Sequence, residues 1–323
     1  MVFTMRIVIK IGTSTLAHHT GRLNIRRTEV LCKVISDLKN AGHEIVMVSS
    51  GAIGMGAGKL SLKERPSDMP TKQAAAAVGQ CELMYTYDKL FGEYNHTVAQ
   101  ILLTSEDIEH DDRRQNVENT MERLLSLGAI PIINENDTIS TSEIVIGDND
   151  TLSAIVASTV HADLLVLLSD IDGLFTADPR KDPSATLIPT VCEITPEIKA
   201  MTSGAGTNLG TGGMTTKIQA AQIATENGID MVIANGADPV ILYGRWKTSR
   251  NTFSCAEKNA LKERTKRIMK ETKCILQEAK AAVSSLAVLK SEEKNKALLA
   301  MADALIADTS SILCENKKDM DAA

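Results

Sequence analysis

Apolar and polar positions follow two alternating patterns from residue 5 to about residue 250. Short, mostly apolar runs are typical of strands buried on both faces of a sheet. They lie at residues 6–11, 43–49, 98–103, 129–133, 164–169 and 231–234. Segments with apolar residues at helical spacing separate them, at residues 24–42, 71–94, 115–127, 151–160 and 218–227. This alternation predicts an α/β fold, a three-layer α/β/α sandwich around a mainly parallel sheet.

The composition changes near residue 256. From there to residue 323 the chain contains no glycine, proline or aromatic residue, and Lys, Glu, Ala and Leu recur in a helical rhythm. Apolar stripes at helical spacing predict amphipathic helices. We therefore expect an α/β domain over residues 1–255, followed by a short all-helical tail over residues 256–323 that carries no evident chemistry.

Charge and cysteine usage exclude several classes of protein. The net charge is −6 and the pI is near 5.6, whereas a nucleic-acid-binding domain needs a basic excess. The six cysteines are scattered without a CxxC pair, which argues against a disulfide framework or a zinc site. No signal peptide and no apolar stretch of about 20 residues is evident. We expect a cytoplasmic protein with no nucleic-acid or membrane partner.

The first candidate for chemistry is the segment Lys-Ile-Gly-Thr-Ser at residues 10–14, where the first predicted strand ends. Ligands of parallel α/β sheets bind beyond the carboxyl ends of the strands. Lys10 would point its ammonium group into that crevice, and Gly12 would let the backbone approach a phosphate. Taken alone the signal is weak, because a lysine at a strand end is commonly a solvated surface residue.

A glycine-rich stretch at residues 49–58 directly follows the second predicted strand and suggests backbone amides turned toward an anion. The spacing excludes two standard phosphate motifs. Ser61, three residues after Gly58, breaks the GxGxxG pattern, and Gly54 lies four residues before Gly58 where GxxxxGK[ST] needs five. A purely structural turn remains the alternative.

A second glycine loop, Gly-Thr-Gly-Gly-Met-Thr-Thr-Lys, occupies residues 210–217 and leads into a predicted helix. The helix macrodipole disfavours a basic residue at a helix N-terminus unless an anion lies there. Lys217 therefore favours a phosphate site at this position.

Polar clusters also follow the later strands. Two of them are Asn-Glu-Asn-Asp at residues 134–137 and Gly-Asp-Asn-Asp at residues 147–150. Their carboxylate and amide groups suit an ammonium group or a magnesium ion. A helix cap is the alternative role for Asp150. Ser169 and Asp170 end the most apolar strand, where an acid commonly accepts a hydrogen bond from a ribose hydroxyl. Two lysines, two glycine loops and several carboxylates together indicate phosphoryl transfer, which needs alignment and charge neutralisation more than covalent help.

The order of these motifs resembles the glutamate 5-kinases of the amino acid kinase family. The resemblance spans residues 5–253 and rests on KIGTS, SSGAIGMG, INEND, GDND, SD, TADP and GTGGMTTK in that order. It implies ATP-dependent phosphorylation of the γ-carboxylate of L-glutamate, the first step of proline biosynthesis. The implied cofactors are ATP and Mg2+, with the ion held through the ATP phosphates and no metal ligand assigned in the chain.

The resemblance also implies a role for each matching residue. Lys10 and Lys217 would stabilise the transferring phosphoryl group, and Asp150 would hold both lysines in place. Glutamate would be bound by Ser50, Asn134, Asp137 and Asn149. The residues implied to contact ATP are Lys10, Gly12, Ser169, Asp170, Thr211, Gly212, Gly213, Met214, Thr215, Thr216 and Lys217. Position 169 is Ser where many relatives carry Thr, which keeps the hydroxyl group.

The tail departs from the commoner domain arrangement of these kinases. Residues 256–323 resemble the opening helices of a γ-glutamyl phosphate reductase, as in fused pyrroline-5-carboxylate synthases, and we expect no reductase activity from them. Expected partners are L-glutamate, a second copy of the chain, a γ-glutamyl phosphate reductase, and proline as a feedback inhibitor. Two alternatives stay open: a related kinase with another carboxylate acceptor, or a non-catalytic regulatory subunit that docks through its tail.

Overall fold

The structure is a computed structural model that describes residues 4–18, 22–64, 66–139, 149–201, 213–243 and 252–253, and five isolated positions further on. Contacts divide the chain into two units, Met1–Asn259 and Ala260–Ala323. The second unit holds the five isolated positions, all helical and exposed: Ser291, Asn295, Lys296, Leu299 and Thr309. The rest of the tail predicted over residues 256–323 lies outside the described residues, so its helices and its boundary stay predictions.

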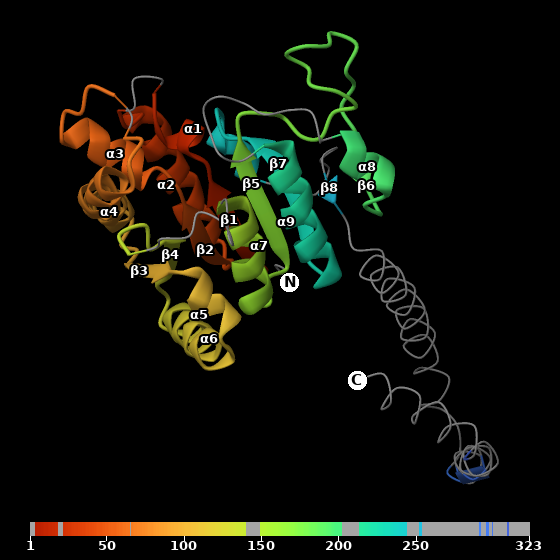
Figure 1. Ribbon diagram of the computed structural model, residues 1–323. Helices are drawn as coiled ribbons and strands as arrows, with labels where there is room; N and C mark the ends of the chain where they lie inside the picture. Colours follow the sequence, from red (N-terminus) through yellow and green to blue (C-terminus); the bar gives the residue numbers. More distant parts are fainter. Residues whose placement is uncertain are drawn as a thin grey trace. The chain divides into compact units, whose positions relative to one another are not determined.

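One sheet forms the centre of the first unit (Figure 1). Its six long strands are parallel and lie in the order β3 (Val98–Leu103), β4 (Ile130–Glu135), β2 (Glu44–Ser49), β1 (Arg6–Ile11), β5 (Leu164–Ser169) and β7 (Asp230–Asn235). Two short strands extend it beyond β7: β8 (Thr252–Phe253), antiparallel to β7, and then β6 (Thr190–Val191). The predicted mainly parallel sheet is confirmed.

Helices cover both faces of this sheet, which confirms the three-layer arrangement. One layer contains α2 (Ile25–Asn40) and α4 (Met69–Gly92), and the opposite layer contains α7 (Asn149–Thr159) and α9 (Met214–Glu226). The shorter or more peripheral helices are α1 (Thr13–Leu16), α3 (Ala52–Lys59), α5 (Ser105–Glu109), α6 (Asp111–Ser126), α8 (Pro196–Met201) and the 3-10 helix η1 (Pro239–Tyr243).

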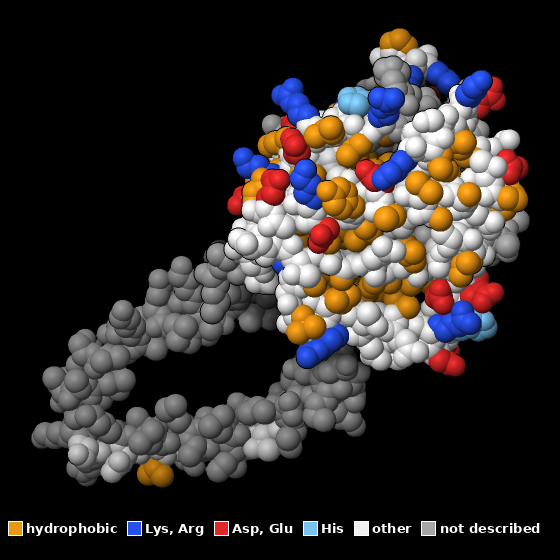
Figure 2. Space-filling model, turned by 90° about the vertical axis from the view of Figure 1, so that its left-hand side faces the viewer, with side chains coloured by type: hydrophobic (Ala, Val, Ile, Leu, Met, Phe, Trp, Pro, Cys, Tyr) orange, Lys and Arg blue, Asp and Glu red, His pale blue; other side chains and the backbone are white. Residues whose placement is uncertain are grey.

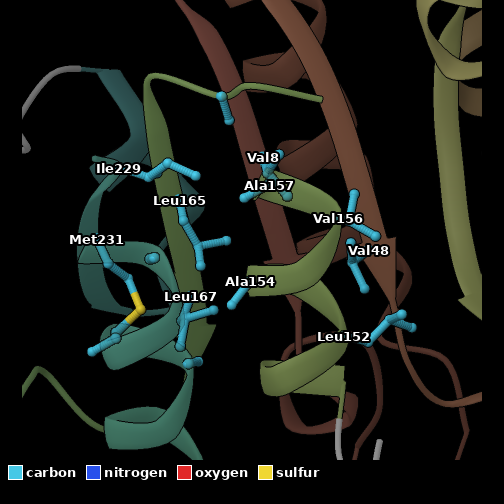
Figure 3. Packing of buried hydrophobic residues seen from close by; sticks show 14 of the residues in the cluster. Val8, Val48, Leu152, Ala154, Val156, Ala157, Leu165, Leu167, Ile229 and Met231 are labelled. Carbon is cyan, nitrogen blue, oxygen red and sulfur yellow. The ribbon is translucent and has the colours of Figure 1, made fainter. Parts of the chain in front are cut away.

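Strand β1 shows how the alternating side chains build two cores. Ile7 and Ile9 point into the cluster shared with α2 and α4, whereas Val8 belongs to the cluster under α7 and α9. Figure 3 shows the second cluster, in which Ala154 and Ala157 of α7 lie against the sheet residues. Small side chains on α7 allow the helix to approach the sheet closely, which places its N-terminus at the carboxyl ends of β1 and β2.

The glycine-rich stretch after β2 forms helix α3 from Ala52 onward. That its backbone amides face an anion stays a prediction. Gly51 makes the sharp turn from the strand into this helix, with a φ of 99° that L side chains rarely adopt. A Cβ on Gly56 would overlap the carbonyl oxygen of Ala75 in α4, and a Cβ on Gly79 would overlap that of Ala52. These two glycines let α3 and α4 pack backbone against backbone.

The outer surface of α3 and α4 is rich in apolar side chains. Figure 2 faces this side of the domain and shows hydrophobic side chains across its middle, with most charged ones nearer the margins. Tyr85 is 65% exposed and Leu60 is 45% exposed. Even so, no helix among the described residues is long and apolar enough to span a membrane.

Candidate phosphoryl-transfer site

The predicted site residues gather at one edge of the sheet. Each described member lies at the carboxyl end of a strand or in the first turn of α7 or α9. They are Lys10, Gly12, Ser50, Asn134, Asp137, Asn149, Asp150, Ser169, Asp170, Gly213, Met214, Thr215, Thr216 and Lys217. Thr211 and Gly212, both predicted to contact ATP, lie outside the described residues, as do residues 147 and 148 of the second acidic cluster.

The centre of the site is a buried cluster of three charges. Lys10 Nζ forms an ion pair with Asp150 Oδ1 at 2.6 Å. Lys217 Nζ donates a hydrogen bond of 2.9 Å to Asp150 Oδ2. The carboxylate is fully buried, and the side chains of Lys10 and Lys217 are 7% and 6% exposed. Asp150 therefore bridges two lysines that come from β1 and α9, and it does not cap its own helix.

The charges within this cluster do not balance. Burial raises the pKa of Asp150, but the ammonium groups of Lys10 and Lys217 outweigh burial and hold the pKa below its usual range. Two positive groups against one negative group leave a net charge of one. In the part of the chain that the structure describes, no second carboxylate pairs with either lysine. A buried, uncompensated positive charge is costly unless an anion binds beside it.

The N-terminus of α9 explains why a lysine is tolerated there. The helix begins at Met214, four residues earlier than predicted, so Lys217 is in its first turn. Asp150 supplies a negative charge at that end of the helix, which relieves part of the conflict with the macrodipole. Thr216 Oγ1 adds a 3.2 Å hydrogen bond to Asp150 Oδ2 and a 2.9 Å bond to the carbonyl of Gly213. Thr216 thus contacts the carboxylate that was predicted to organise the lysines.

Gly12 keeps the space beside Lys10 open. A Cβ at this position would lie 3.1 Å from the carbonyl oxygen of Leu168 and 3.8 Å from Lys10 Nζ. A side chain here would therefore press on β5 and crowd the ammonium group. That Gly12 lets the backbone approach a phosphate stays a prediction.

A second network, made of neutral groups, lies next to the charged one. Asn149 Nδ2 donates hydrogen bonds to Ser50 Oγ at 2.7 Å, to the carbonyl of Ser49 at 2.9 Å and to Asn134 Oδ1 at 3.2 Å. The buried Oδ1 atom of Asn149 has no hydrogen-bond partner among the described residues. Three of the four residues predicted to bind the acceptor are thus joined directly, and one buried acceptor atom is available to a ligand.

Asp137 is the fourth predicted acceptor residue and forms no hydrogen bond with the other three described residues. Burial raises the pKa of its carboxyl group. A cationic ligand beside this partly buried carboxylate would lower its pKa again, because a nearby positive charge stabilises the ionised form. The position directly after β4 therefore suits a ligand ammonium group.

Two residues of α4 support the neutral network and were missed from sequence. Gln80 Oε1 accepts a 2.9 Å hydrogen bond from Asn134 Nδ2, and the Tyr87 hydroxyl is 2.9 Å from Ser49 Oγ. Both side chains are buried. The only signal in the sequence is that they share the buried face of an alanine-rich helix with apolar residues, where a polar group needs a partner.

Of the two predicted nucleotide residues at the end of β5, Ser169 is buried and Asp170 is exposed. Ser169 Oγ donates to Asp170 Oδ1 at 3.3 Å, and Arg180 Nη2 donates to Asp170 Oδ2 at 2.8 Å. The side chain of Asp170 is 54% exposed. Among the described residues, no hydrogen bond or ion pair joins Ser169 or Asp170 to the lysine cluster. Among the described residues there is also no group of three or more His, Cys, Asp or Glu side chains suited to a metal ion.

Comparisons with a protein-family model and with curated proteins agree with one another. The model of the amino acid kinase family matches residues 5–235. Two curated relatives are glutamate 5-kinases: that of Clostridium perfringens is 55% identical over 241 residues, covering 73% of this chain and 90% of the relative. That of Clostridium acetobutylicum is 59% identical over 231 residues, covering 72% and 86%.

Two solved structures share the fold. Carbamate kinase from Giardia lamblia bound to AMP-PNP aligns with a TM-score of 0.57 and 18% identity, covering 79% of this chain and 99% of that chain. UMP kinase from Ureaplasma parvum aligns with a TM-score of 0.53 and 15% identity, covering 78% and 99%. At these identities the likeness concerns the fold alone.

Proposed function

This chain belongs to the amino acid kinase family, and from that premise we propose that it is a glutamate 5-kinase. It transfers the γ-phosphoryl group of ATP to the γ-carboxylate of L-glutamate and releases ADP, which is the first step of proline biosynthesis. One observation carries the chemistry: the buried Lys10–Asp150–Lys217 cluster has one positive charge more than it neutralises. A phosphoryl group is an anion of the kind that this cluster lacks.

The reaction requires little beyond alignment and charge neutralisation. A γ-carboxylate oxygen of glutamate forms a bond to the γ-phosphorus, the bond from that phosphorus to the bridging oxygen breaks, and the electron pair leaves with ADP. Lys10 and Lys217 stabilise the negative charge on the transferring group from two sides. The acceptor carboxylate is ionised at neutral pH, so no general base has to remove a proton from it.

Asp150 acts through the two lysines. Its two oxygens each contact one ammonium group, so the distance between the lysines is set by one rigid carboxylate at the start of α7. Preorganised charges stabilise a transition state without rearranging as it forms. We therefore assign Asp150 a positioning role.

The neutral network is the proposed binding site for the acceptor. Ser50, Asn134 and Asn149 are already joined by hydrogen bonds, and Asn149 Oδ1 is a buried acceptor that fits a ligand N–H group. Asp137 would pair with the α-ammonium group of free glutamate. An N-acetylated acceptor has no such charge, which favours glutamate over acetylated relatives.

ATP is the phosphoryl donor expected of a kinase of this family. We propose that Gly12, Ser169, Asp170 and residues 211–217 contact the nucleotide, and that Mg2+ enters with it. Magnesium in kinase sites binds phosphate oxygens and one or two carboxylates. The half-exposed carboxylate of Asp170 is a donor of the right kind, with Arg180 as its present partner. When bound, the ion would neutralise charge on the phosphates.

A coupled assay of ADP release tests the proposal across several acceptors. Glutamate should support turnover with Mg-ATP, whereas aspartate and N-acetylglutamate should not. Turnover with either of these and none with glutamate would replace the proposed acceptor by another carboxylate. Absence of turnover with every acceptor would favour the alternative of a non-catalytic regulatory subunit.

The remaining partners are proposed from the family resemblance. They are a second copy of the chain, proline as a feedback inhibitor, and a γ-glutamyl phosphate reductase, whose opening helices residues 256–323 resemble. Light scattering on the full chain and on a chain ending at residue 255, with ADP release measured in both with and without proline, tests these points. An unchanged mass and unchanged activity on deletion would make the tail inert.

A further inference from the structure

Helix α4 reaches into the acceptor site although none of the predicted site residues belongs to it. We propose that Gln80 is a positioning residue for glutamate, acting through Asn134 and Asn149. This inference rests on the proposed function, because it assigns a role within the same acceptor site.

A one-way chain of hydrogen bonds connects Gln80 to the site. The chain is anchored on the backbone carbonyl of Ser49, which can only accept, so the Nδ2 atom of Asn149 must face it at 2.9 Å. The same Nδ2 atom donates to Asn134 Oδ1 at 3.2 Å. Asn134 is then left with Nδ2 on its other side, and that atom donates to Gln80 Oε1 at 2.9 Å. Gln80 is the acceptor on which the chain ends.

Burial makes this last bond consequential. Asn134 is 2% exposed and Gln80 is 7% exposed, so water does not readily replace either partner. Without Gln80 Oε1, the Nδ2 group of Asn134 would be a buried donor with no acceptor, which is unfavourable. Rotation of the Asn134 amide would relieve that, but it would withdraw Oδ1 from Asn149. The two Nδ2 protons of Asn149 would then lose one of the three acceptors that they share, and with it part of the orientation of the side chain.

The packing of α4 prevents the backbone from compensating. Gly79, directly before Gln80, contacts the backbone of α3 so closely that a Cβ there would overlap the carbonyl oxygen of Ala52. About two turns further along, Tyr87 is fully buried against Ser49. Helix α4 is therefore fixed on both sides of Gln80, and it holds the amide at a defined place relative to Asn134.

The Gln80→Met variant tests the proposal, because methionine keeps the length of the side chain and removes both hydrogen-bonding groups. We expect the KM for glutamate to rise about tenfold, the KM for ATP to stay unchanged, and kcat to change less than twofold. The matched control is Thr86→Val on the same helix, which removes only a bond to the carbonyl of Glu82 within α4. It should leave all three parameters unchanged.

A double-mutant cycle with Asn134→Leu distinguishes positioning from general support. If Gln80 acts through Asn134, adding Gln80→Met to Asn134→Leu should raise the KM for glutamate no further. Equal losses in both KM values and in kcat, or a full additional effect in the double variant, would overturn the proposal. If Gln80→Met fails to fold, Gln80→Ala, which favours the helix and adds no bulk, carries the same expectation.

The two hypotheses fail separately. A wild-type chain that does not phosphorylate glutamate refutes the proposed function. A wild-type chain that does so, together with an unchanged KM for glutamate in Gln80→Met, refutes only the role of Gln80.

Discussion

Two networks meet at the first turn of α7, where Asn149 and Asp150 are neighbours in sequence. Asp150 is in a charged network, fully buried between two lysines. Asn149 is in a neutral network of amide and hydroxyl groups. The charged network is buried and the neutral network is partly buried. Both join distant parts of the chain, but the first depends on net charge and the second on the direction of its hydrogen bonds.

The difference follows from what each network has to recognise. A transferring phosphoryl group carries a high negative charge that point charges stabilise from any direction. Choosing one amino-acid acceptor among similar carboxylates needs fixed donors and acceptors, because unpaired polar groups reject the wrong ligand. Since α7 supplies one residue to each network, a single rigid element would position both the acceptor and the phosphoryl group in the function that we propose. Four predictions, from the largest effect to the smallest, test this division.

The Asp150→Asn variant should break the charged network. It leaves two buried ammonium groups without a carboxylate, and removing one partner of a buried ion pair destabilises by about 3–5 kcal/mol. Urea denaturation should show that loss in the free energy of unfolding. Asp170→Asn is the control, because its partner Arg180 is half exposed and such pairs contribute about 0–1 kcal/mol. Equal small losses in both variants would contradict the importance of burial.

The Lys10→Ala and Lys217→Ala variants should separate rate from acceptor affinity. Removing one stabilising charge typically costs about 10²–10³ in kcat. The KM for glutamate should change much less, because neither lysine contacts the neutral network directly. Steady-state ADP release measures both parameters. The control is Lys59→Ala, which removes an exposed lysine that pairs with Glu82 and should change neither parameter. A rise in the KM for glutamate alone in Lys10→Ala would contradict the separation of the two networks.

The strands could be predicted from sequence because local composition determines them. The strands at residues 6–11, 98–103 and 164–169 are confirmed at both ends. Each is a run of apolar residues that the sheet buries or half buries, with polar or glycine residues next to it. Helix starts were harder to predict. Helix α9 begins at Met214, directly after its N-cap Gly213. Its first turn, Met-Thr-Thr-Lys, has no apolar periodicity that would mark it as helical. Likewise, α6 begins at Asp111 instead of residue 115.

The positions of the strands predict the gathering of only those site residues that follow strands; Asp150 and Lys217 were predicted from local motifs at helix starts. Lys10, Ser50 and Asn134 follow or end strands, so the edge of the sheet predicts that they gather there. The bond from Lys217 to Asp150 joins residues 67 positions apart, and the bond from Asn134 to Gln80 joins residues 54 apart. Such contacts leave no local pattern. The helix formed by the glycine-rich stretch of α3 is likewise not evident from local sequence, since tertiary packing against α4 overrides the low helix propensity of glycine.

The Gly56→Ala variant should weaken the neutral network by disturbing the packing of α3 on α4, the helix that carries Gln80. An added Cβ would overlap the carbonyl oxygen of Ala75, forcing α3 and α4 apart at a cost of about 1–3 kcal/mol. Gly54→Ala in the same helix is a matched control, because a Cβ there meets nothing within 4 Å. It should be neutral or stabilise by up to about 1 kcal/mol. Thermal unfolding compares the two, and similar behaviour would mean that the glycines serve something other than helix packing.

The Asp137 carboxylate offers the finest test, because it is the one charged group proposed for the otherwise neutral acceptor site. Burial raises its pKa. An ammonium ligand prefers the ionised form, so glutamate should bind fully above that raised pKa and progressively more weakly as the pH falls through it. The KM for glutamate should then rise, by at most about tenfold per pH unit.

Protonation of glutamate itself also contributes in acid, and the Asp137→Asn variant separates the two effects. This variant should have a higher KM for glutamate at neutral pH and a flatter dependence on pH than the wild type, while the KM for ATP follows the same pH profile in both. Parallel glutamate profiles for the two proteins would remove Asp137 from the acceptor site. Recognition of the α-ammonium group would then rest on the amide oxygen of Asn149, and the acceptor site would be neutral throughout.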